Sequence, residues 1–158
     1  MGLTLNVRPA SIEDAVDVVR LARSLSIING VRTSRLTEAA YRRDGFGDQP
    51  AFYVLIAEIN ETAVGYVLYY PGYDTVRATR GIYLADLYVD DGYRRLGVGR
   101  ALMRALAKAC CDLGGEWMFW SVLKRNRVAR KFYRTLAPEL KNVVLCAALG
   151  DSFERLAR

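Results

Sequence analysis

Apolar residues along the chain follow two different periods. Alternation with polar residues, which is typical of strands, begins at Leu3, Leu5 and Val7, and helical spacing of three and four residues begins after Ser11, a good N-cap. Both patterns recur along the chain, separated by turns rich in glycine, proline and asparagine. They predict strands over residues 3–7, 52–58, 63–70, 81–89, 116–122 and 143–149, and helices over 11–25, 37–44, 100–113 and 127–136.

The order of these elements narrows the fold class. Strands 52–58 and 63–70 flank a short turn, so they predict a hairpin that Pro71 ends. Strand 81–89 is apolar on both faces, which favours a position inside the sheet. The whole order, β-α-α-β-β-β-α-β-α-β, predicts a mixed sheet with helices on its faces, of the α/β or α+β class, in a single domain over 1–158.

The composition excludes several kinds of site. Of the 158 residues, 52% are hydrophobic, which is enough for a buried core, and none is histidine. Histidine triads, histidine metal sites and a histidine general base are therefore excluded. Cys110 and Cys111 are adjacent and lack the spacer of a zinc-binding pair, so no metal is predicted. With Cys146 the cysteine count is odd, which favours a reducing, cytoplasmic setting, and neither a secretory leader nor a membrane span is expected.

The net charge of +6 indicates anionic partners, among them phosphate-rich cofactors, nucleic acid and lipid headgroups. No recognition-helix pattern or basic run supports nucleic-acid binding. Four tyrosines are expected to pack against other side chains rather than to stack on bases: Tyr41, Tyr69, Tyr70 and Tyr83.

The segment over 87–102 carries the clearest chemistry. A predicted strand runs into a loop that contains Arg94, Arg95, Gly97 and Gly99, and this loop opens the amphipathic helix. The first N–H groups of a helix have no intrahelical acceptor and carry partial positive charge, while glycine lets a phosphate approach the backbone closely. The pattern predicts an anion cradle.

Two other glycine motifs do not fit this loop. Leu102 stands where the third glycine of a dinucleotide fingerprint would fall, and no Gly-Lys-Ser/Thr follows as in a nucleotide-triphosphate loop.

The run Arg-Arg-Leu-Gly-Val-Gly-Arg-Ala from Arg94 resembles the Arg/Gln-x-x-Gly-x-Gly/Ala motif of the GCN5-related N-acetyltransferases, and Asn126 and Phe132-Tyr133 agree with that family's downstream pattern. The resemblance implies acetyl-CoA as co-substrate, with its pyrophosphate on the loop amides, and Tyr133 as the acid beside the CoA sulfur. The residues it implies for cofactor binding are Leu87, Tyr88, Val89, Arg94, Arg95, Leu96, Gly97, Val98, Gly99, Arg100, Asn126, Arg130 and Phe132.

One branch of the family is more similar than the rest. Asp44-Gly45-Phe46-Gly47 and the segments 67–70, 73–74 and 83–89 resemble the diamine (spermidine/spermine-type) acetyltransferases. This resemblance implies a twisted, mostly antiparallel mixed sheet with helices on both faces. It also implies a V-shaped splay between two central parallel strands, 82–89 and 116–122, that holds the cofactor, and a homodimer.

The sequence departs from that branch at three positions. Ala85 stands where the polyamine enzymes carry a glutamate that has been treated as a general base acting through water. Val76 and Arg125 stand where they carry tryptophans. These differences leave acetyl transfer intact as an expectation and leave polyamine specificity open.

Acetyl transfer from a thioester to an amine assigns the remaining roles. The main-chain N–H near Leu87 is expected to polarise the acetyl carbonyl, and Tyr133 to protonate the departing thiolate. Asp86, Glu58 and Asp74 are candidates to take the proton from the substrate ammonium through water. Asp74 and Asp86 are also candidate contacts of the substrate amine. Direct attack without an acyl-enzyme is expected.

The resulting hypothesis is an acetyl-CoA-dependent N-acetyltransferase acting on a primary amine of a small cationic substrate, a diamine, polyamine or amino-acid-like molecule. Acidic residues at Asp44, Asp48 and Asp74 agree with a cationic acceptor. Two alternatives stay open: a CoA-binding regulatory module that has lost catalysis, and an acetyltransferase that acts on a protein amine.

Overall fold

The computed structural model describes residues 2–31 and 34–158. The chain forms two compact units, the first ending at Ser121 and the second running from Val122 to Arg158. A single domain over 1–158 stays a prediction.

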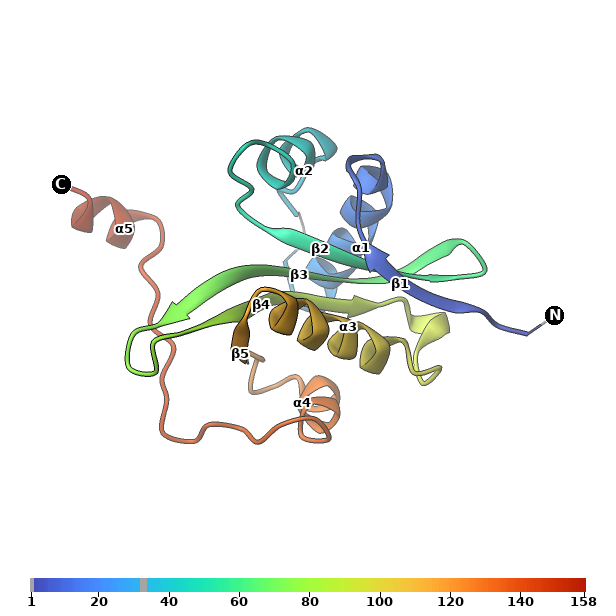
Figure 1. Cartoon of the computed structure of the whole chain (residues 1–158). Helices are drawn as coiled ribbons and strands as arrows, with labels where there is room; N and C mark the ends of the chain where they lie inside the picture. Colours follow the sequence, from blue (N-terminus) through green and yellow to red (C-terminus); the bar gives the residue numbers. More distant parts are fainter. Residues whose placement is uncertain (1, 32–33) are drawn as a thin grey trace. The chain divides into compact units, whose positions relative to one another are not determined.

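The first unit is built on one five-stranded sheet in the order β1-β2-β3-β4-β5 (Figure 1). Neighbouring strands are antiparallel except β4 and β5, which are parallel, so the predicted mixed and mostly antiparallel sheet is confirmed. The strands are β1 (Leu5–Pro9), β2 (Tyr53–Ile59), β3 (Thr62–Asp74), β4 (Thr79–Val89) and β5 (Gly115–Trp120).

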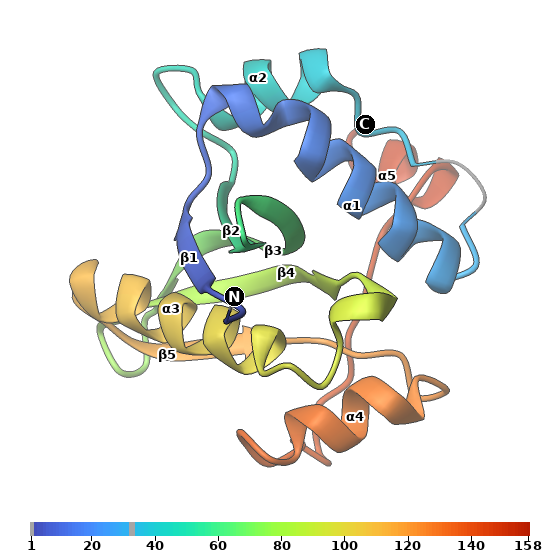
Figure 2. The ribbon, with the colours of Figure 1, turned by 90° about the vertical axis from the view of Figure 1, so that its right-hand side faces the viewer.

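Helices cover both faces of this sheet. α1 (Ala15–Ile28) and α2 (Glu38–Gly45) lie on one face, and α3 (Val98–Asp112) lies on the other (Figures 1 and 2). A short 3-10 turn, η1 (Ile12–Asp14), leads into α1, and the Ser11 side chain caps it as predicted.

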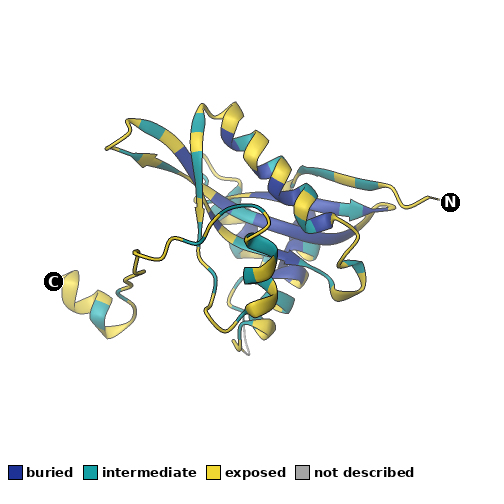
Figure 3. Cartoon of the chain, turned by 90° about the horizontal axis from the view of Figure 1, so that it is seen from below, coloured by how far each residue is buried: buried dark blue, intermediate teal, exposed yellow. Residues whose placement is uncertain are grey.

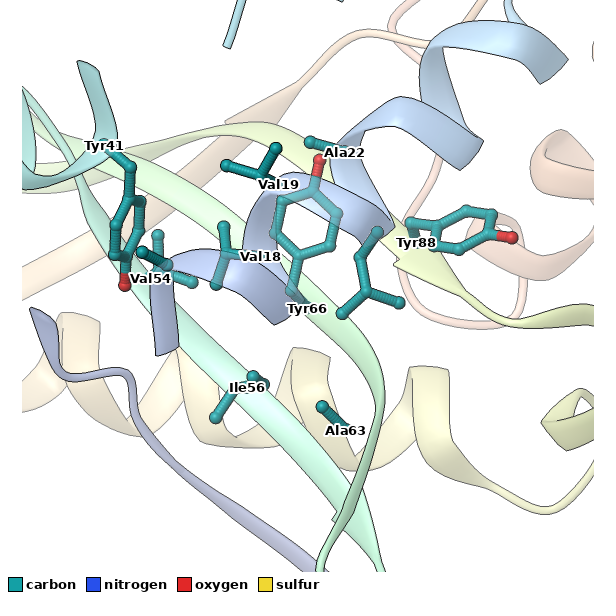
Figure 4. Close-up of a cluster of buried hydrophobic side chains, with 11 residues drawn as sticks. Val18, Val19, Ala22, Tyr41, Val54, Ile56, Ala63, Tyr66 and Tyr88 are labelled. Atoms are coloured by element: carbon teal, nitrogen blue, oxygen red, sulfur yellow. The ribbon is translucent and has the colours of Figure 1, made fainter. Parts of the chain in front are cut away.

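α1 and α3 each bury an apolar face against the sheet, whereas Val16 and Leu113, which the sequence pattern places on those faces, are exposed. Val18 and Leu21 of α1 are fully buried in a cluster with Tyr66 of β3, which Figure 4 shows among side chains of α1 and β2. On the opposite face, Leu102 and Leu106 of α3 are also fully buried. Burial of each such side chain contributes roughly 1.5–3 kcal/mol, so both layers hold the sheet in place.

β3 is longer than the sequence predicts. It continues through Pro71 and Gly72 to Asp74, whereas the prediction ends the strand at Pro71. A Cβ at Gly72 would lie 2.7 Å from the rings of both Tyr83 and Trp117, so this glycine allows the rings to pack on the strand rather than ending it.

The predicted strand over 143–149 is absent. These residues form no strand, and a helix that the sequence does not predict, α5 (Asp151–Leu156), follows them. Because β5 is the last strand of the sheet among the described residues, the predicted central position of strand 116–122 is also wrong. A strand needs a partner for its backbone N–H and C=O groups, and the residue pattern alone does not supply one.

No helix in the described ranges is both long enough and apolar enough to cross a bilayer.

Candidate active site

The loop between β4 and α3 has the backbone that its glycines predict. After Val89 the chain makes a 3-10 turn, η2 (Asp91–Tyr93), and enters α3 through left-handed residues at Arg95 (φ 64°) and Gly97 (φ 83°). A Cβ at Gly97 would meet no atom within 4 Å, so the requirement for glycine there comes from conformation and not from crowding. The open space beside Gly97 fits close approach of a ligand.

The start of α3 can receive an anion. The Ala101 N–H donates the first bond of the helix, to Gly97 O at 2.9 Å, which leaves the N–H groups of the preceding turn without an intrahelical acceptor. The first turn contains no acidic residue. The helix dipole and these amides together fit a diphosphate.

Arg94 is held within this loop rather than extended from it. Its guanidinium pairs with the Asp91 carboxylate at 2.7 Å, and its Nε donates to Val89 O at 3.2 Å. Arg95 is exposed. Contact of Arg94 with phosphate stays a prediction, and it requires that Asp91 share or release the guanidinium.

β4 separates from β5 at its carboxyl end. Their parallel register runs from Arg80 opposite Gly115 to Leu84 opposite Trp120, whereas β4 itself continues to Val89. The β5 register therefore does not extend over residues 85–89 of β4. This is the arrangement expected for the predicted splay. Leu87, whose N–H is the predicted donor to the acetyl carbonyl, lies within this stretch of β4.

A β-bulge lies at the point where the two strands part. Leu68 of β3 pairs with Asp86 and Tyr69 pairs with Leu84, so Ala85 has no opposite residue. The register from Val89 to Asp86 is regular, so Asp86 lies on the same face of the sheet as Tyr66, toward α1, and the bulge reverses the facing of β4 from Leu84 backwards. Nothing in the residue period of β4 marks the bulge, so it could not be predicted from the sequence.

Asp86 has an unusual environment for a carboxyl group. Its Oδ2 accepts a hydrogen bond from the Tyr66 hydroxyl at 3.0 Å, and Tyr66 is fully buried. Burial raises the pKa of Asp86, while the hydrogen bond from Tyr66 partly opposes that rise. No ion pair to Asp86 is formed within the described residues.

The other two candidate proton acceptors are paired with arginine. Glu58 accepts from Arg8 at 2.5 Å. Asp74 pairs with Arg77 and caps the turn after β3 through the Val76 N–H, and the hydrogen bond from Arg77 lowers the pKa of Asp74. Asp74 is therefore the weaker base, and the Glu58 carboxylate is occupied by Arg8, so Asp86 differs from both in having no cation partner among the described residues.

The second unit contains α4 (Arg127–Tyr133), which is shorter than the predicted helix over 127–136. Asn126 caps α4 by accepting from the Ala129 N–H at 3.0 Å. Tyr133 is the last residue of the helix, with its ring 5.4 Å from that of Phe132. Arg130 makes two 2.8 Å hydrogen bonds to Glu139.

These contacts give Asn126 and Arg130 structural partners of their own. Their predicted roles in cofactor binding, and the role of Tyr133 as an acid, stay predictions.

The four tyrosines expected to pack do so, each in contact with other side chains or main chain. Tyr41 is fully buried with its hydroxyl on Ser11 O, and Tyr69 stacks on Tyr53. Tyr70 and Tyr83 contact each other, with ring centroids 5.7 Å apart.

Comparison with known proteins identifies the class. The family model of the acetyltransferase (GNAT) family matches residues 21–137. The chain therefore belongs to this family and is an enzyme of the N-acetyltransferase class. Among the described residues, no group of three His, Cys, Asp or Glu side chains is arranged to hold a metal ion.

Relatives place the chain beside the diamine acetyltransferase branch that its sequence resembles. It is 33% identical over 142 residues to the thialysine N-epsilon-acetyltransferase of Bos taurus, covering 84% of this chain and 83% of that one. It is 33% identical over 135 residues to the spermidine/spermine N(1)-acetyltransferase-like protein 1 of Homo sapiens, covering 80% of this chain and 19% of that protein.

The fold is also that of a solved aminoglycoside N-acetyltransferase in complex with CoA. The TM-score is 0.75 at 18% identity, with 93% of this chain and 95% of the other covered. The relatives' names are consistent with an amine as acceptor.

Proposed function

We propose that this protein is an acetyl-CoA-dependent N-acetyltransferase that acetylates a primary amine of a small cationic substrate, a diamine, polyamine or amino-acid-like molecule. The observation that carries the proposal is Asp86, a partly buried carboxyl with no arginine partner among the described residues, located where β4 leaves β5. The anion-binding turn before α3 follows on the same strand.

Bound acetyl-CoA supplies the acetyl group as a thioester. The turn from Arg95 to Gly99 binds the pyrophosphate with its amides, and the positive charge of Arg94 and Arg95 assists. The edge of β4 over Leu87, Tyr88 and Val89 orients the pantetheine arm. Asn126, Arg130 and Phe132 are further proposed cofactor contacts, as are Leu96 and Val98 within the turn and Arg100 directly after it.

Three groups of the chain carry the transfer. Asp86 accepts a proton from the substrate ammonium through water, which leaves a neutral amine whose lone pair forms the new C–N bond. The Leu87 N–H donates to the carbonyl oxygen as negative charge develops there. The Tyr133 hydroxyl gives its proton to the sulfur as the C–S bond breaks. The proton that the nitrogen loses as the amide forms restores the Tyr133 hydroxyl, and the proton taken up by Asp86 is released to solvent.

Attack is direct, without an acyl-enzyme. Cys110 is buried in α3 with its thiol on Trp117 O at 3.4 Å, and burial raises its pKa. A thiol in this state is a poor nucleophile. An acetylated cysteine trapped during turnover would contradict the proposal.

We propose a cationic acceptor for the acetyl group because acidic side chains lie on the strands that form the site. Asp86 receives the amine, and Asp74 at the end of β3 contacts the far ammonium. The relatives' names, which contain thialysine and spermidine/spermine, support this class. Because Ala85 stands where the polyamine enzymes carry a glutamate, Asp86 is the proposed base. The length of the amine substrate is a question for the experiment below.

We further propose a homodimer of one-domain subunits in the cytoplasm. The family match runs across both units, which supports one domain. Between α4 and α5 the side chains of Val143, Val144, Leu145 and Leu149 are 63–83% exposed, and the stretch is drawn as exposed in Figure 3. A second copy that covers these apolar residues removes them from water.

The test is thiol release from acetyl-CoA with a panel of polyamines, lysine analogues, aminoglycosides and short peptides. We expect turnover with at least one small cationic amine. Asp86→Asn should lower kcat/KM at least a hundredfold, and Tyr133→Phe should lower kcat while cofactor binding persists. Asp112→Asn, which removes an exposed carboxylate on α3, is the matched control and should be neutral.

Two results would redirect the proposal. A thermal shift with CoA but no turnover on any amine favours the regulatory module. Turnover on peptides alone favours a protein amine.

A further inference from the structure

The proposed reaction makes no use of the hydrogen bond between Tyr66 and Asp86. Tyr66 is on β3, two residues from the position that pairs with Asp86, and its ring is fully buried against α1. Its hydroxyl donates to Asp86 Oδ2 at 3.0 Å. Nothing in the residue pattern around Tyr66 distinguishes it from a packing tyrosine.

A purely structural role does not require a carboxylate at this position. A buried tyrosine hydroxyl needs an acceptor, and Tyr41 in the same core finds one in the main-chain oxygen of Ser11 at 2.9 Å. A neutral carbonyl therefore suffices in this core. Pairing Tyr66 with an ionisable group instead places a charge in a poorly solvated location, which costs stability that a structural role alone does not require.

We propose that Tyr66 is a positioning residue for proton transfer to Asp86, holding one carboxylate oxygen so that the other faces the substrate amine. The inference rests on the proposed function of Asp86 as the proton acceptor. Oδ2 is fixed by Tyr66, and no hydrogen bond to Oδ1 is recorded within the described part of the chain. The carboxylate then has one defined orientation at the end of the β4 bulge.

Other titratable or charged groups near this face have partners of their own. Tyr88, next on the same face of β4, interacts with Ser24 of α1 and with Asp90. Arg20 of α1 pairs with Asp90 at 2.8 Å and donates to Ala63 O. Tyr66 is thus the polar contact of Asp86 from β3, with burial as the opposing influence on its pKa.

The sign of the effect follows from the geometry. A hydrogen bond donated to a carboxylate stabilises the charged form, so its loss raises the pKa of Asp86. The acidic limb of kcat/KM reports the base in the free enzyme. Tyr66→Phe should therefore move that limb to higher pH by about one unit. The plateau value of kcat/KM should fall only slightly.

The experiment compares pH profiles of kcat/KM for the wild type, Tyr66→Phe and Tyr41→Phe. Tyr41→Phe is the matched control, since it removes a buried tyrosine hydroxyl from the same core without touching Asp86. A shift of the limb in Tyr66→Phe alone supports the proposal. An unmoved limb, or equal shifts in both variants, overturns it.

A second probe covers the case in which Tyr66→Phe does not fold. A fluorinated tyrosine at position 66 keeps the ring and strengthens the donor, so the limb should move to lower pH, and an unmoved limb again overturns the inference. Asp86→Asn separates the two ideas. If Asp86→Asn loses activity and the Tyr66 variants leave the limb in place, only the positioning role fails. If Asp86→Asn keeps full activity, the proposed base fails first.

Discussion

Gly97 illustrates how one residue can be required by its backbone alone. Its φ of 83° lies in the left-handed region, and the space beside its Cα is empty. Arg95, two residues earlier, holds a similar conformation with a side chain, at φ 64°. Strain of this kind persists where the surrounding structure fixes it, and it is common in ligand-binding turns.

Gly97→Ala tests the conformation of the turn. A left-handed alanine costs about 1–2 kcal/mol, so the free energy of unfolding should fall by that amount and KM for acetyl-CoA should rise by roughly tenfold. Chemical denaturation and thiol-release kinetics measure the two effects. Gly92→Ala is the control, because its Cβ also meets open space and its φ is not positive. Equal effects in both variants would show that the turn does not depend on the left-handed conformation.

At the scale of elements, ion pairs connect segments that the sequence separates widely. Arg8 of β1 forms hydrogen bonds with Asp14 of η1, at 2.8 Å, and with Glu58 of β2, at 2.5 Å. Hydrogen bonding to Arg8 lowers the pKa of Asp14 to about 2, and the Ser11 N–H contributes in the same direction. The pair joins the start of α1 to the sheet beneath it.

This network predicts a pH dependence of stability. Because the pKa of Asp14 is lower in the folded state, its contribution is present above the unfolded value near 4 and is lost as pH falls toward 2. Asp14→Asn should cost about 1–2 kcal/mol at neutral pH, discounted for the partly exposed Arg8, and progressively less in acid. Urea denaturation at several pH values measures the difference. Asp112→Asn, which breaks an exposed pair with Lys108, should show no such trend.

At the scale of the whole molecule, the apolar run at 143–149 is the main feature that a single copy leaves unexplained. Its side chains are among the most exposed apolar groups in the described chain, Val144 at 83% and Leu145 at 78%. Isolated exposed apolar residues are ordinary, but a contiguous run of them marks an interaction surface.

The proposed dimer can be tested on this run. Replacing both Val144 and Leu145 with aspartate should halve the mass measured by light scattering, since two buried charges would oppose association. Val76→Asp controls for loss of an exposed valine, because Val76 is 93% exposed in the turn after β3. A monomeric wild type, or a dimer that persists in the double variant, rules out this surface.

The sequence by itself determined the elements whose cause is local. The period of apolar residues, Ser11 as a cap and the glycine turn before an amphipathic helix are properties of neighbouring residues, so they could be predicted, and the mixed sheet followed from their order. The family followed from the resemblance of the motif that begins at Arg94. The missing histidine likewise restricted the chemistry before any fold was known.

Tertiary structure decided what depends on residues that are distant in sequence. Pairing across β3 and β4 created the bulge at Ala85 and placed Asp86 on the face of Tyr66. Within residues 2–31 and 34–158, Asp86 has no arginine partner of the kind that Glu58 and Asp74 each have. The strand predicted over 143–149 failed for the same reason: a strand is defined by its hydrogen-bonding partner, and only the folded chain, alone or with a second copy, can supply one.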